Sequence, residues 1–150
     1  MKSISVVIVS YHTGPIIFES ISSVLKQKNI SQIIVVDNGN PAGVVDALKR
    51  EFGSNDHFQL ISGHGNIGFS RACNLAVKKA RGELLLLLNP DCIIPDNGIN
   101  VLSQVAEPFT GQWLLAPRLV NLDRTEQQGV RREILTPWIA FVEGIKLYKL

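Results

Sequence analysis

The sequence predicts an α/β fold in which helices cover both faces of a mostly parallel central β-sheet. Two observations lead to this fold class. Apolar runs of strand length alternate with segments whose apolar residues recur at helical spacing, and the alternation repeats along the chain. The chain has 150 residues, of which 45% are hydrophobic and 19% charged, a composition typical of one globular domain with a layered core. Right-handed crossovers would then join the parallel strands.

Strands are predicted where apolar runs end in polar turns. The runs cover residues 4 to 11, 32 to 36, 58 to 62, 84 to 88 and, as a fifth strand, 113 to 120. Leu84 to Leu88 are consecutive leucines, so both faces of that strand are apolar. We therefore expect it in the middle of the sheet, covered on both sides. Pro117 places the fifth strand at an edge or a bulge.

Helices are predicted between these strands. Pro15 suits the first turn of a helix that reaches about Lys28, and Asp96 can cap the helix that follows the leucine run. The apolar residues expected to face the core share helical spacing within each of the later helices; they are Val45, Leu48 and Phe52, then Phe69, Cys73, Ala76 and Ala80, then Leu102, Val105 and Phe109.

Composition excludes several classes of protein. The formal net charge is +2, from 15 Lys and Arg against 13 Asp and Glu, and without an aromatic and basic stripe we expect no nucleic-acid partner. Cys73 and Cys92 have no metal-ligand spacing, and Cys73 is expected to be a small buried hydrophobe. The N-terminus lacks signal-peptide features, and no apolar run reaches the roughly 18 residues of a membrane span. We expect a cytoplasmic protein that is at most peripheral to the membrane.

Polar clusters follow the predicted strands. They are Ser10-Tyr11-His12, Asp37-Asn38, Gly63 to Asn66, and Asn89-Pro90-Asp91. If the strands are parallel, all of these clusters open on one edge of the sheet, where α/β proteins bind their ligands. The sequence therefore predicts a binding site at the carboxyl ends of the strands.

Some of these residues suit particular ligands. Asp37 is either a residue that simply favours a turn or a carboxylate that accepts the imide or amide hydrogen of a base. Asp91 is either a turn residue or one hard oxygen ligand for Mg²⁺ or Mn²⁺, with diphosphate oxygens and water completing the shell. Arg71 is either a solvated surface charge or a partner for a phosphate or base.

The glycine-rich stretch from Gly63 to Gly68 fits the pattern G-x-G-x-x-G, follows a predicted strand and opens a helix. A dinucleotide site would use Asp91 as its acid. However, the motif lies in the third strand-to-helix turn instead of the first, and Asn89-Pro90 separates the acid from its strand. We favour a flexible turn and a helix N-terminus whose amides attract anions. Ser70 lies well past the end of the strand, so this stretch is a poor match to the nucleophile elbow of a hydrolase.

Runs at residues 7–11, 34–39, 66–74 and 87–91 occur in order and in register. Together with Ala116 to Asn121, they make residues 4 to 132 resemble the N-terminal, nucleotide-binding part of the family 2 inverting glycosyltransferases, which have the GT-A fold. The Asn-Pro-Asp variant resembles bacterial rhamnosyltransferases of polysaccharide assembly in particular.

The resemblance implies a role for each candidate residue. Ser10 and Tyr11 would line the nucleoside pocket, where Asp37 would bind the base and Asn38 would take part in nucleotide binding. The remaining roles would be nucleotide contacts by Asn66 and Arg71, a ribose contact by Asn89, and binding by Asp91 of the Mg²⁺ or Mn²⁺ that bridges the diphosphate.

The expected activity is transfer of a sugar from a nucleoside-diphosphate donor, such as dTDP-rhamnose, to a glycan or lipid-linked acceptor in cell-surface polysaccharide synthesis. No match to the family's general-base motif precedes Leu150, so the catalytic base is unassigned and we expect a truncated chain that is mainly the donor-binding part. Two alternatives stay open: a nucleotide-binding module without activity of its own, and an NAD-dependent oxidoreductase.

We expect residues 1–132 to form the nucleotide-sugar-binding subdomain, with the acceptor-binding half absent. Residues 133–150 would form an amphipathic segment, whose apolar residues at helical spacing are Trp138, Phe141, Val142, Ile145 and Tyr148. This segment either packs on protein or lies at the inner face of the membrane, near a lipid-linked acceptor.

Overall fold

The computed structural model of the chain describes residues 2–121 and 123–127. The chain divides into two compact units, residues 1–111 and 112–150, which are described separately below. The predicted boundary at residue 132 and the amphipathic segment 133–150 fall outside the described residues. Among the helices that are described, none is long and apolar enough to cross a membrane.

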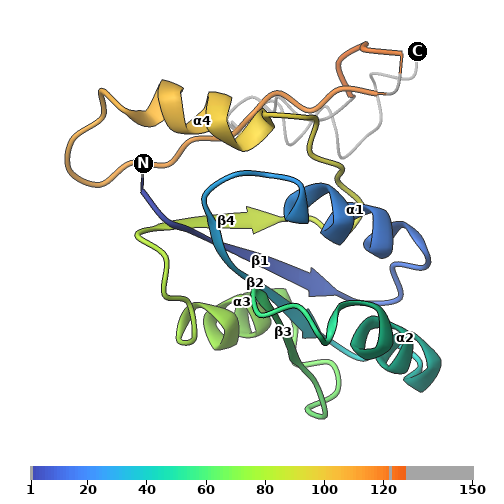
Figure 1. The fold of residues 1–150 in the computed structure, drawn as a ribbon. Helices are drawn as coiled ribbons and strands as arrows, with labels where there is room; N and C mark the ends of the chain where they lie inside the picture. The colour runs from blue at the N-terminus through green and yellow to red at the C-terminus, as the bar shows by residue number, and fades with distance from the viewer. Residues whose placement is uncertain (1, 122, 128–150) are drawn as a thin grey trace, which may run out of the picture. The chain divides into compact units, whose positions relative to one another are not determined.

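The first unit is built on a parallel sheet of four strands in the order β3-β2-β1-β4 (Figure 1). The strands are β1 (Ile4–Ser10), β2 (Ile30–Asp37), β3 (Phe58–Ile61) and β4 (Leu84–Leu88). Helices α1 (Ile16–Leu25), α2 (Ala42–Phe52), α3 (Phe69–Val77) and α4 (Gly98–Ala106) follow them in alternation. The α/β fold with a parallel sheet is therefore confirmed.

Helices cover both faces of the two central strands. On β1, Val6 and Ile8 face the side that α1, α2 and α4 cover, whereas Val7 and Val9 face α3. This division follows from the alternation of side chains along a strand. All residues of β1 are buried, which explains why its sequence is a continuous apolar run and not an alternating one. Cys73 of α3 is buried, as predicted.

The predicted central position of the leucine strand is wrong. Strand β4 lies at the edge of the sheet, beside β1. Its alternate leucines pack against the core under α1 and α4, but Leu85 and Leu87 on the other face are 44% and 52% exposed. Helix α3 packs on β1 and β2, and no other described element of this unit covers the second face of β4.

Three expectations about the helices also fail. Phe69 is 57% exposed at the start of α3 instead of facing the core. Asp96 does not cap α4, because the residue before the helix is Asn97, in the left-handed conformation and without a side-chain capping bond. Helix α4 buries Ile99 and Ala106, while Val105 is half exposed. Ile99 and Ala106 lie seven positions apart and share the face of the helix that is turned to the core, a different face from the predicted one.

A buried polar cluster fixes the amino end of the sheet. The Ser5 hydroxyl accepts hydrogen bonds from the backbone amides of Arg81 (3.2 Å) and Gly82 (2.8 Å), just before β4. The Gln32 side-chain oxygen accepts from the same Arg81 amide at 3.2 Å, and its Nε2 donates to Gln59 Oε1 at 2.8 Å. These hydrogen bonds join β1, β2, β3 and the residues just before β4 at the amino end of the sheet. The predicted site lies at the opposite, carboxyl end.

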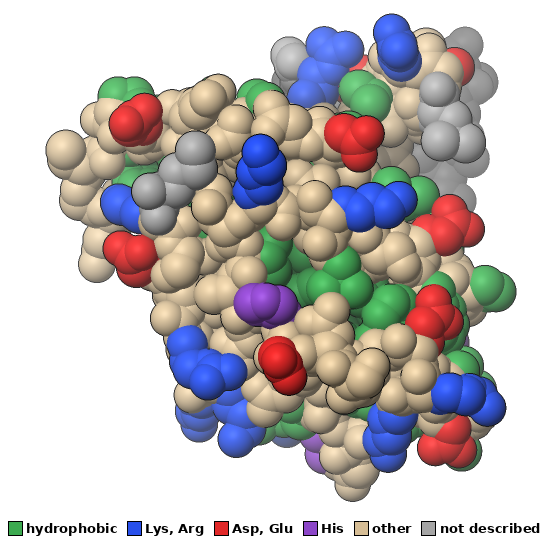
Figure 2. Space-filling model, in the orientation of Figure 1, with side chains coloured by type: hydrophobic (Ala, Val, Ile, Leu, Met, Phe, Trp, Pro, Cys, Tyr) green, Lys and Arg blue, Asp and Glu red, His purple; other side chains and the backbone are tan. Residues whose placement is uncertain are grey.

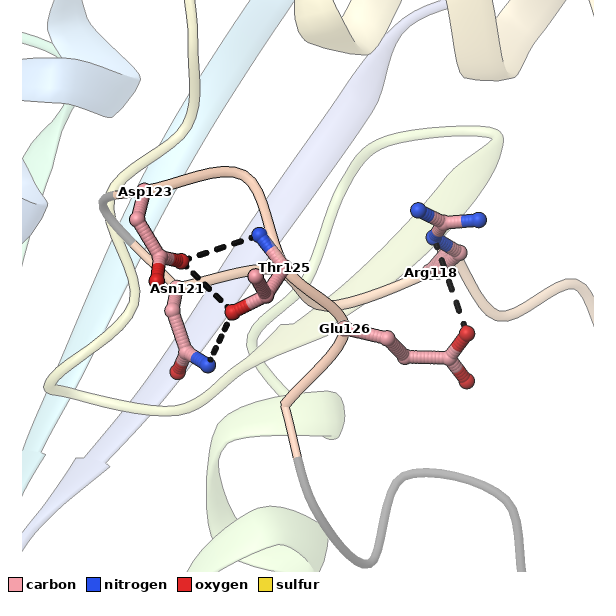
Figure 3. A network of polar contacts seen from close by, with 5 residues as sticks. All are labelled: Arg118, Asn121, Asp123, Thr125 and Glu126. Carbon is pink, nitrogen blue, oxygen red and sulfur yellow. Dashed lines mark hydrogen bonds and ion pairs between the residues drawn. The ribbon is translucent and has the colours of Figure 1, made fainter.

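In the second unit, no strand spans residues 113 to 120 within the described part, contrary to prediction. An isolated antiparallel bridge pairs Val120 with Glu126, and a polar turn lies between them (Figure 3). Asp123 Oδ1 accepts from the Thr125 hydroxyl at 2.6 Å and from its amide at 2.9 Å. Asn121 Nδ2 donates to the same hydroxyl at 2.9 Å. These side-chain bonds add to the backbone hydrogen bonds of the reversal, such as that from the Asn121 amide to the Thr125 carbonyl at 2.8 Å.

Candidate functional site

The carboxyl ends of β1 and β2 are tied together by one amide side chain. Asn40 Nδ2 donates to the Ser10 carbonyl at 3.0 Å and to Asp37 Oδ1 at 2.8 Å. The Ser10 hydroxyl donates in return to Asn40 Oδ1 at 3.2 Å and lies 3.1 Å from the Thr13 hydroxyl. Ser10 is fully buried, so its side chain helps to hold the turn at this edge.

The carboxylate of Asp37 uses its two oxygens differently. Oδ1 accepts three hydrogen bonds, from the Gly39 amide (3.2 Å), the Asn40 amide (2.8 Å) and Asn40 Nδ2 (2.8 Å). Among the described residues, no donor reaches Oδ2. Asp37 is 7% exposed, so the turn holds the carboxylate in one orientation. The remaining oxygen is thus available to a ligand that supplies an N–H or O–H.

A second link joins the end of β2 to the turn before α3. Asn38 Nδ2 donates to Asn66 Oδ1 at 3.1 Å, and Asn38 Oδ1 accepts from the Ile67 amide at 3.0 Å. Asn66 Oδ1 also accepts from the Gly68 amide at 2.9 Å. Asn38 is buried, and both ends of its side-chain amide are used within the protein.

Tyr11 lies close to this link. Gly39 has φ +106°, and a Cβ placed there would lie 3.4 Å from the Asn66 amide nitrogen and 3.6 Å from Tyr11 Cε2. The Tyr11 ring is 55% exposed and meets His12 edge-on at 4.6 Å between centroids. An aromatic surface that is open to solvent therefore stands beside the Asp37 turn, where a planar base could pack.

Helix α3 begins next to the same turn. Gly68 precedes the helix with φ +82°, and its carbonyl accepts a hydrogen bond from the Ala72 amide at 3.1 Å. Arg71 lies in the first turn of α3 and is exposed. A helix N-terminus attracts anions through its free amides, and a guanidinium one turn away adds positive charge that a phosphate can pair with.

Asn89 and Asp91 follow the end of β4, and both are exposed. Because Leu88 pairs with Ile8, the end of β4 lies beside the end of β1. The Asp91 carboxylate has a weak contact from the Cys92 thiol at 3.9 Å. Burial raises the pKa of that thiol, and the charge and hydrogen bond of Asp91 raise its pKa further.

A divalent metal ion could bind here through the Asp91 carboxylate together with oxygen atoms of a bound ligand. The described residues contain no group of three or more His, Cys, Asp and Glu side chains that could hold a metal. The exposed Asp91 carboxylate supplies a single hard oxygen ligand. Mg²⁺ and Mn²⁺ commonly bind through one or two carboxylates together with substrate phosphates. The residues therefore suit a metal that arrives with a diphosphate.

Helix α1 positions the chain that follows Asp91. The Ser23 hydroxyl accepts from the Ile94 amide at 3.0 Å. The buried Gln27 side chain accepts from the Ile99 amide at 3.2 Å and donates to the Pro95 carbonyl at 3.1 Å. The turn that carries Asn89 and Asp91 is thus held on one side by β4 and on the other by α1.

The structure brings several of the predicted residues together. Ser10 and Asp37 share one hydrogen-bonded group, Asn38 and Asn66 share a second, and Tyr11 lies against the glycine between them. Within the described residues, no hydrogen bond connects the side chains of Arg71, Asn89 or Asp91 to these groups. The ligand contacts predicted for these residues stay predictions.

Sequence reasoning missed the residues that hold the others in place. They are Thr13, Ser23, Gln27 and Asn40. Asn40 lies in the dense turn that follows β2, and its side chain, of a type that often bonds to nearby backbone, was the available signal. Gln27 gave none, because a glutamine near the end of an amphipathic helix is ordinarily a solvated residue.

The acidic and basic side chains on the face drawn in Figure 2 are interspersed instead of gathered by sign. This face therefore presents no broad surface of one charge sign.

Comparison with known proteins places this chain in a family. Residues 5–141 match glycosyl transferase family 2. The chain is 31% identical over 106 residues to glycosyltransferase GlyG of Streptococcus pneumoniae serotype 4, a match that covers 67% of this chain and 34% of the relative. The chain therefore spans about a third of the length of that relative.

Solved structures share the fold. The mannosyltransferase PcManGT from Pyrobaculum calidifontis, in complex with GDP-Man and Mn²⁺, is 23% identical with a TM-score of 0.62, over 71% of this chain and 33% of that one. TarS 1–349 of S. aureus, in complex with UDP-GlcNAc, is 20% identical with a TM-score of 0.61, over 70% and 31%. The parallel sheet and its helices thus match the GT-A architecture. With most of its length matched by the family, the chain belongs to glycosyltransferase family 2.

Proposed function

We propose that this chain binds a nucleoside-diphosphate sugar together with Mg²⁺ or Mn²⁺ at the carboxyl edge of its sheet. It would serve as the donor-binding part of an inverting glycosyltransferase. The observation that carries the proposal is the Asp37 carboxylate, whose Oδ1 is held by three donors while Oδ2 has none among the described residues. Such a group is set to accept the ring N–H of a base.

Each remaining residue has a place around that contact. Tyr11 offers an exposed ring beside Asp37 for the base or ribose. Asn89 can hydrogen-bond a ribose hydroxyl without adding charge. Arg71 and the start of α3 offer positive charge and free amides to the phosphates. Asn38 and Ser10 act on the nucleotide by fixing the two turns, since their side chains are buried.

Asp91 would hold the metal ion, which when bound offsets the negative charge that develops on the leaving diphosphate. The names of structural neighbours support a donor of this class, since two of them were solved with GDP-Man and Mn²⁺ and with UDP-GlcNAc. We extend the proposal to a dTDP-linked donor such as dTDP-rhamnose, because the thymine ring has the same N–H as uracil.

The acceptor and the cellular site belong to the same proposal. We expect a glycan or a lipid-linked acceptor of cell-surface polysaccharide synthesis, with transfer on the cytoplasmic side of the membrane. Residues 133–150 would make the peripheral membrane contact. Direct displacement at the anomeric carbon requires a base for the acceptor hydroxyl, and none is assigned among the described residues.

Calorimetry tests the donor site. UDP, dTDP and GDP are titrated into the 150-residue chain with and without Mn²⁺, with NAD as the control ligand. We expect binding that Mn²⁺ strengthens, and Asp91→Ala should remove the strengthening while leaving metal-free binding in place. Absence of binding to any nucleoside diphosphate would refute the proposal, and binding of NAD alone would favour an oxidoreductase.

A second candidate is a nucleotide-binding module that transfers nothing by itself. It is favoured by one observation, that the chain spans about a third of its relatives' length. Binding without release of free sugar or transfer to any acceptor, together with transfer by a longer chain that contains the same residues, would support it.

A further inference from the structure

One side chain controls how the proposed base-binding carboxylate is presented. Asn40 comes three residues after Asp37 and joins the ends of β1 and β2 through its amide. Every polar atom of that amide is used: Nδ2 donates to Ser10 O and Asp37 Oδ1, and Oδ1 accepts from the Ser10 hydroxyl. Asn40 is therefore fixed by β1 at the same time as it fixes Asp37.

We propose that Asn40 is a positioning residue that sets the base selectivity of the site by holding Asp37 Oδ1 inward and leaving Oδ2 for the ligand. This inference rests on the function proposed above, because it assumes that Asp37 meets the base. The orientation of the Asp37 carboxylate, and not only its presence, would then determine which base binds.

The chemistry of the bases explains the selectivity. An ionised carboxylate only accepts hydrogen bonds. Uracil and thymine present a ring N3–H and guanine presents a ring N1–H. Cytosine N3 and adenine N1 are acceptors, so those two bases can reach the carboxylate only through their exocyclic amines. A hydrogen bond to a charged group contributes about 1.5–3 kcal/mol, which corresponds to roughly tenfold to a hundredfold in affinity.

Removing the Asn40 side chain changes the orientation without removing the carboxylate. Two of the three donors to Oδ1 are backbone amides, of Gly39 and Asn40 itself, and they remain in Asn40→Ala. The side-chain link from the turn to Ser10 is lost, although the Asn38 backbone amide still donates to the Ser10 carbonyl at 2.8 Å. The Asp37 carboxylate is then held less firmly in its orientation. We expect a partial loss of selectivity, smaller than the loss caused by Asp37→Ala.

The control variant cuts a buried polar contact at the opposite end of the same strands. Ser5→Ala removes the acceptor for the Gly82 amide and one of the two acceptors for the Arg81 amide. Ser5 lies at the amino end of β1, away from the turn. It should lower the Tm without touching base selectivity. If Ser5→Ala does not fold, Ser103→Ala, which removes one hydrogen bond to the Ile99 carbonyl in α4, takes its place.

The experiment compares dissociation constants for UDP and CDP, and for GDP and ADP, in the unchanged chain, Asn40→Ala, Asp37→Ala and Ser5→Ala, with a Tm for each. We expect the unchanged chain to prefer UDP over CDP by about tenfold or more. In Asn40→Ala that ratio should fall at least fivefold, and in Ser5→Ala it should hold within twofold.

The outcomes separate this inference from the proposed function. If the unchanged chain binds UDP selectively and Asn40→Ala keeps the same ratio while losing only Tm, the inference is overturned and the donor site stands. If Asp37→Ala keeps the preference for UDP, the base is read by other residues and the inference is overturned, while binding of a nucleoside diphosphate and the proposed donor site stand. If the unchanged chain binds no nucleoside diphosphate, the proposed function fails and this inference with it.

Discussion

Asn38 and Asn66 lie 28 positions apart in the sequence, yet Asn38 Nδ2 donates a hydrogen bond of 3.1 Å to Asn66 Oδ1. Asn38 is buried and completes the link by accepting the Ile67 amide. The pair fixes the turn before α3 against the end of β2. The position of the α3 N-terminus, which we propose to face the phosphates, thus depends on a contact between two amides.

Replacing Asn38 by Ala should therefore affect both stability and ligand binding. The change leaves the partly buried Ile67 amide without its acceptor. An unsatisfied buried donor costs about 1–3 kcal/mol, and the loss here should lie toward the lower end of that range. We expect the free energy of unfolding to fall by that amount in urea titrations with an unchanged m-value, and UDP to bind more weakly because α3 is less well held.

Two further variants make the result interpretable. Asn38→Asp keeps an oxygen that accepts from the Ile67 amide. It replaces the donor Nδ2 with a second oxygen, which would face Asn66 Oδ1, so only the hydrogen bond between residues 38 and 66 should be lost. Asn55→Ala removes a local bond to the His57 amide in an exposed turn and should cost less than about 0.5 kcal/mol. Equal losses in Asn38→Ala and Asn55→Ala would contradict the importance of the link.

This part of the site was accessible from the sequence for a simple physical reason. Parallel strands all end at the same edge, so polar residues that follow buried runs must meet there. Ser10, Asp37 and Asn66 obey that rule. What the sequence could not supply was which amide bonds to which, because Asn38 and Asn40 have the same side chain and only the path of the turn decides their partners.

The leucine strand shows where such reasoning fails. A run that is apolar on both faces predicts a covered strand, but the number of helices on each face depends on the connections and not on the strand itself. Helix α3 packs on β1 and β2, and Leu85 and Leu87 stay exposed within the described residues.

The two faces of β4 should respond differently to substitution. Leu86 packs against the core cluster, so Leu86→Ala should cost about 2–3 kcal/mol of unfolding free energy through lost burial and a cavity. Leu87 is half exposed, and Leu87→Ala should cost less than about 1 kcal/mol. Chemical denaturation of both variants checks this difference. A cost for Leu87→Ala as large as that for Leu86→Ala would show that the second face of β4 is covered in solution.

Gly82 is required where the chain enters β4. A Cβ at this position would lie 2.4 Å from the Ser5 amide nitrogen and 2.8 Å from the Ile4 carbonyl carbon, both backbone atoms of the central strand. Gly82→Ala should therefore destabilise the protein by at least about 1–3 kcal/mol, the usual cost of overpacking. Differential scanning calorimetry measures the shift in Tm.

Gly43 gives the matched control. It lies in the first turn of α2, and a Cβ there would have no atom within 4 Å. Gly43→Ala should raise stability by about 0.5–1 kcal/mol, because alanine loses less backbone freedom in a helix. If both glycine variants shift the Tm in the same direction, the close approach at Gly82 is not what determines the effect.

The turn at Asp123 predicts a pH effect whose sign is fixed. The Thr125 hydroxyl, and then the Thr125 amide, hold the pKa of the Asp123 carboxyl below its ordinary value. Because the folded pKa is lower than the unfolded one, the turn is stabilised above the ordinary carboxyl pKa and loses that contribution as the pH falls through the lowered value. Thr125→Val removes the hydroxyl and should raise the pKa of Asp123 in an NMR titration. An unchanged pKa of Asp123 in this variant would contradict the assignment.

Gln27 couples α1 to the segment that follows the proposed metal ligand. Its buried side chain accepts from the Ile99 amide and donates to the Pro95 carbonyl, which also accepts from the Gly98 amide. Gln27→Ala therefore leaves the buried Ile99 amide without its acceptor and should cost about 1–3 kcal/mol. Since these bonds hold the chain beyond Asp91, we also expect Mn²⁺ to strengthen UDP binding less in this variant, while metal-free UDP binding stays within twofold. Leu86→Ala supplies a control of similar cost, because Leu86 packs against the hydrophobic core and, within the described residues, makes no hydrogen bond to the segment beyond Asp91. An equal loss of the Mn²⁺ effect in both variants would mean that stability alone, and not the position of the Asp91 turn, governs the metal contribution.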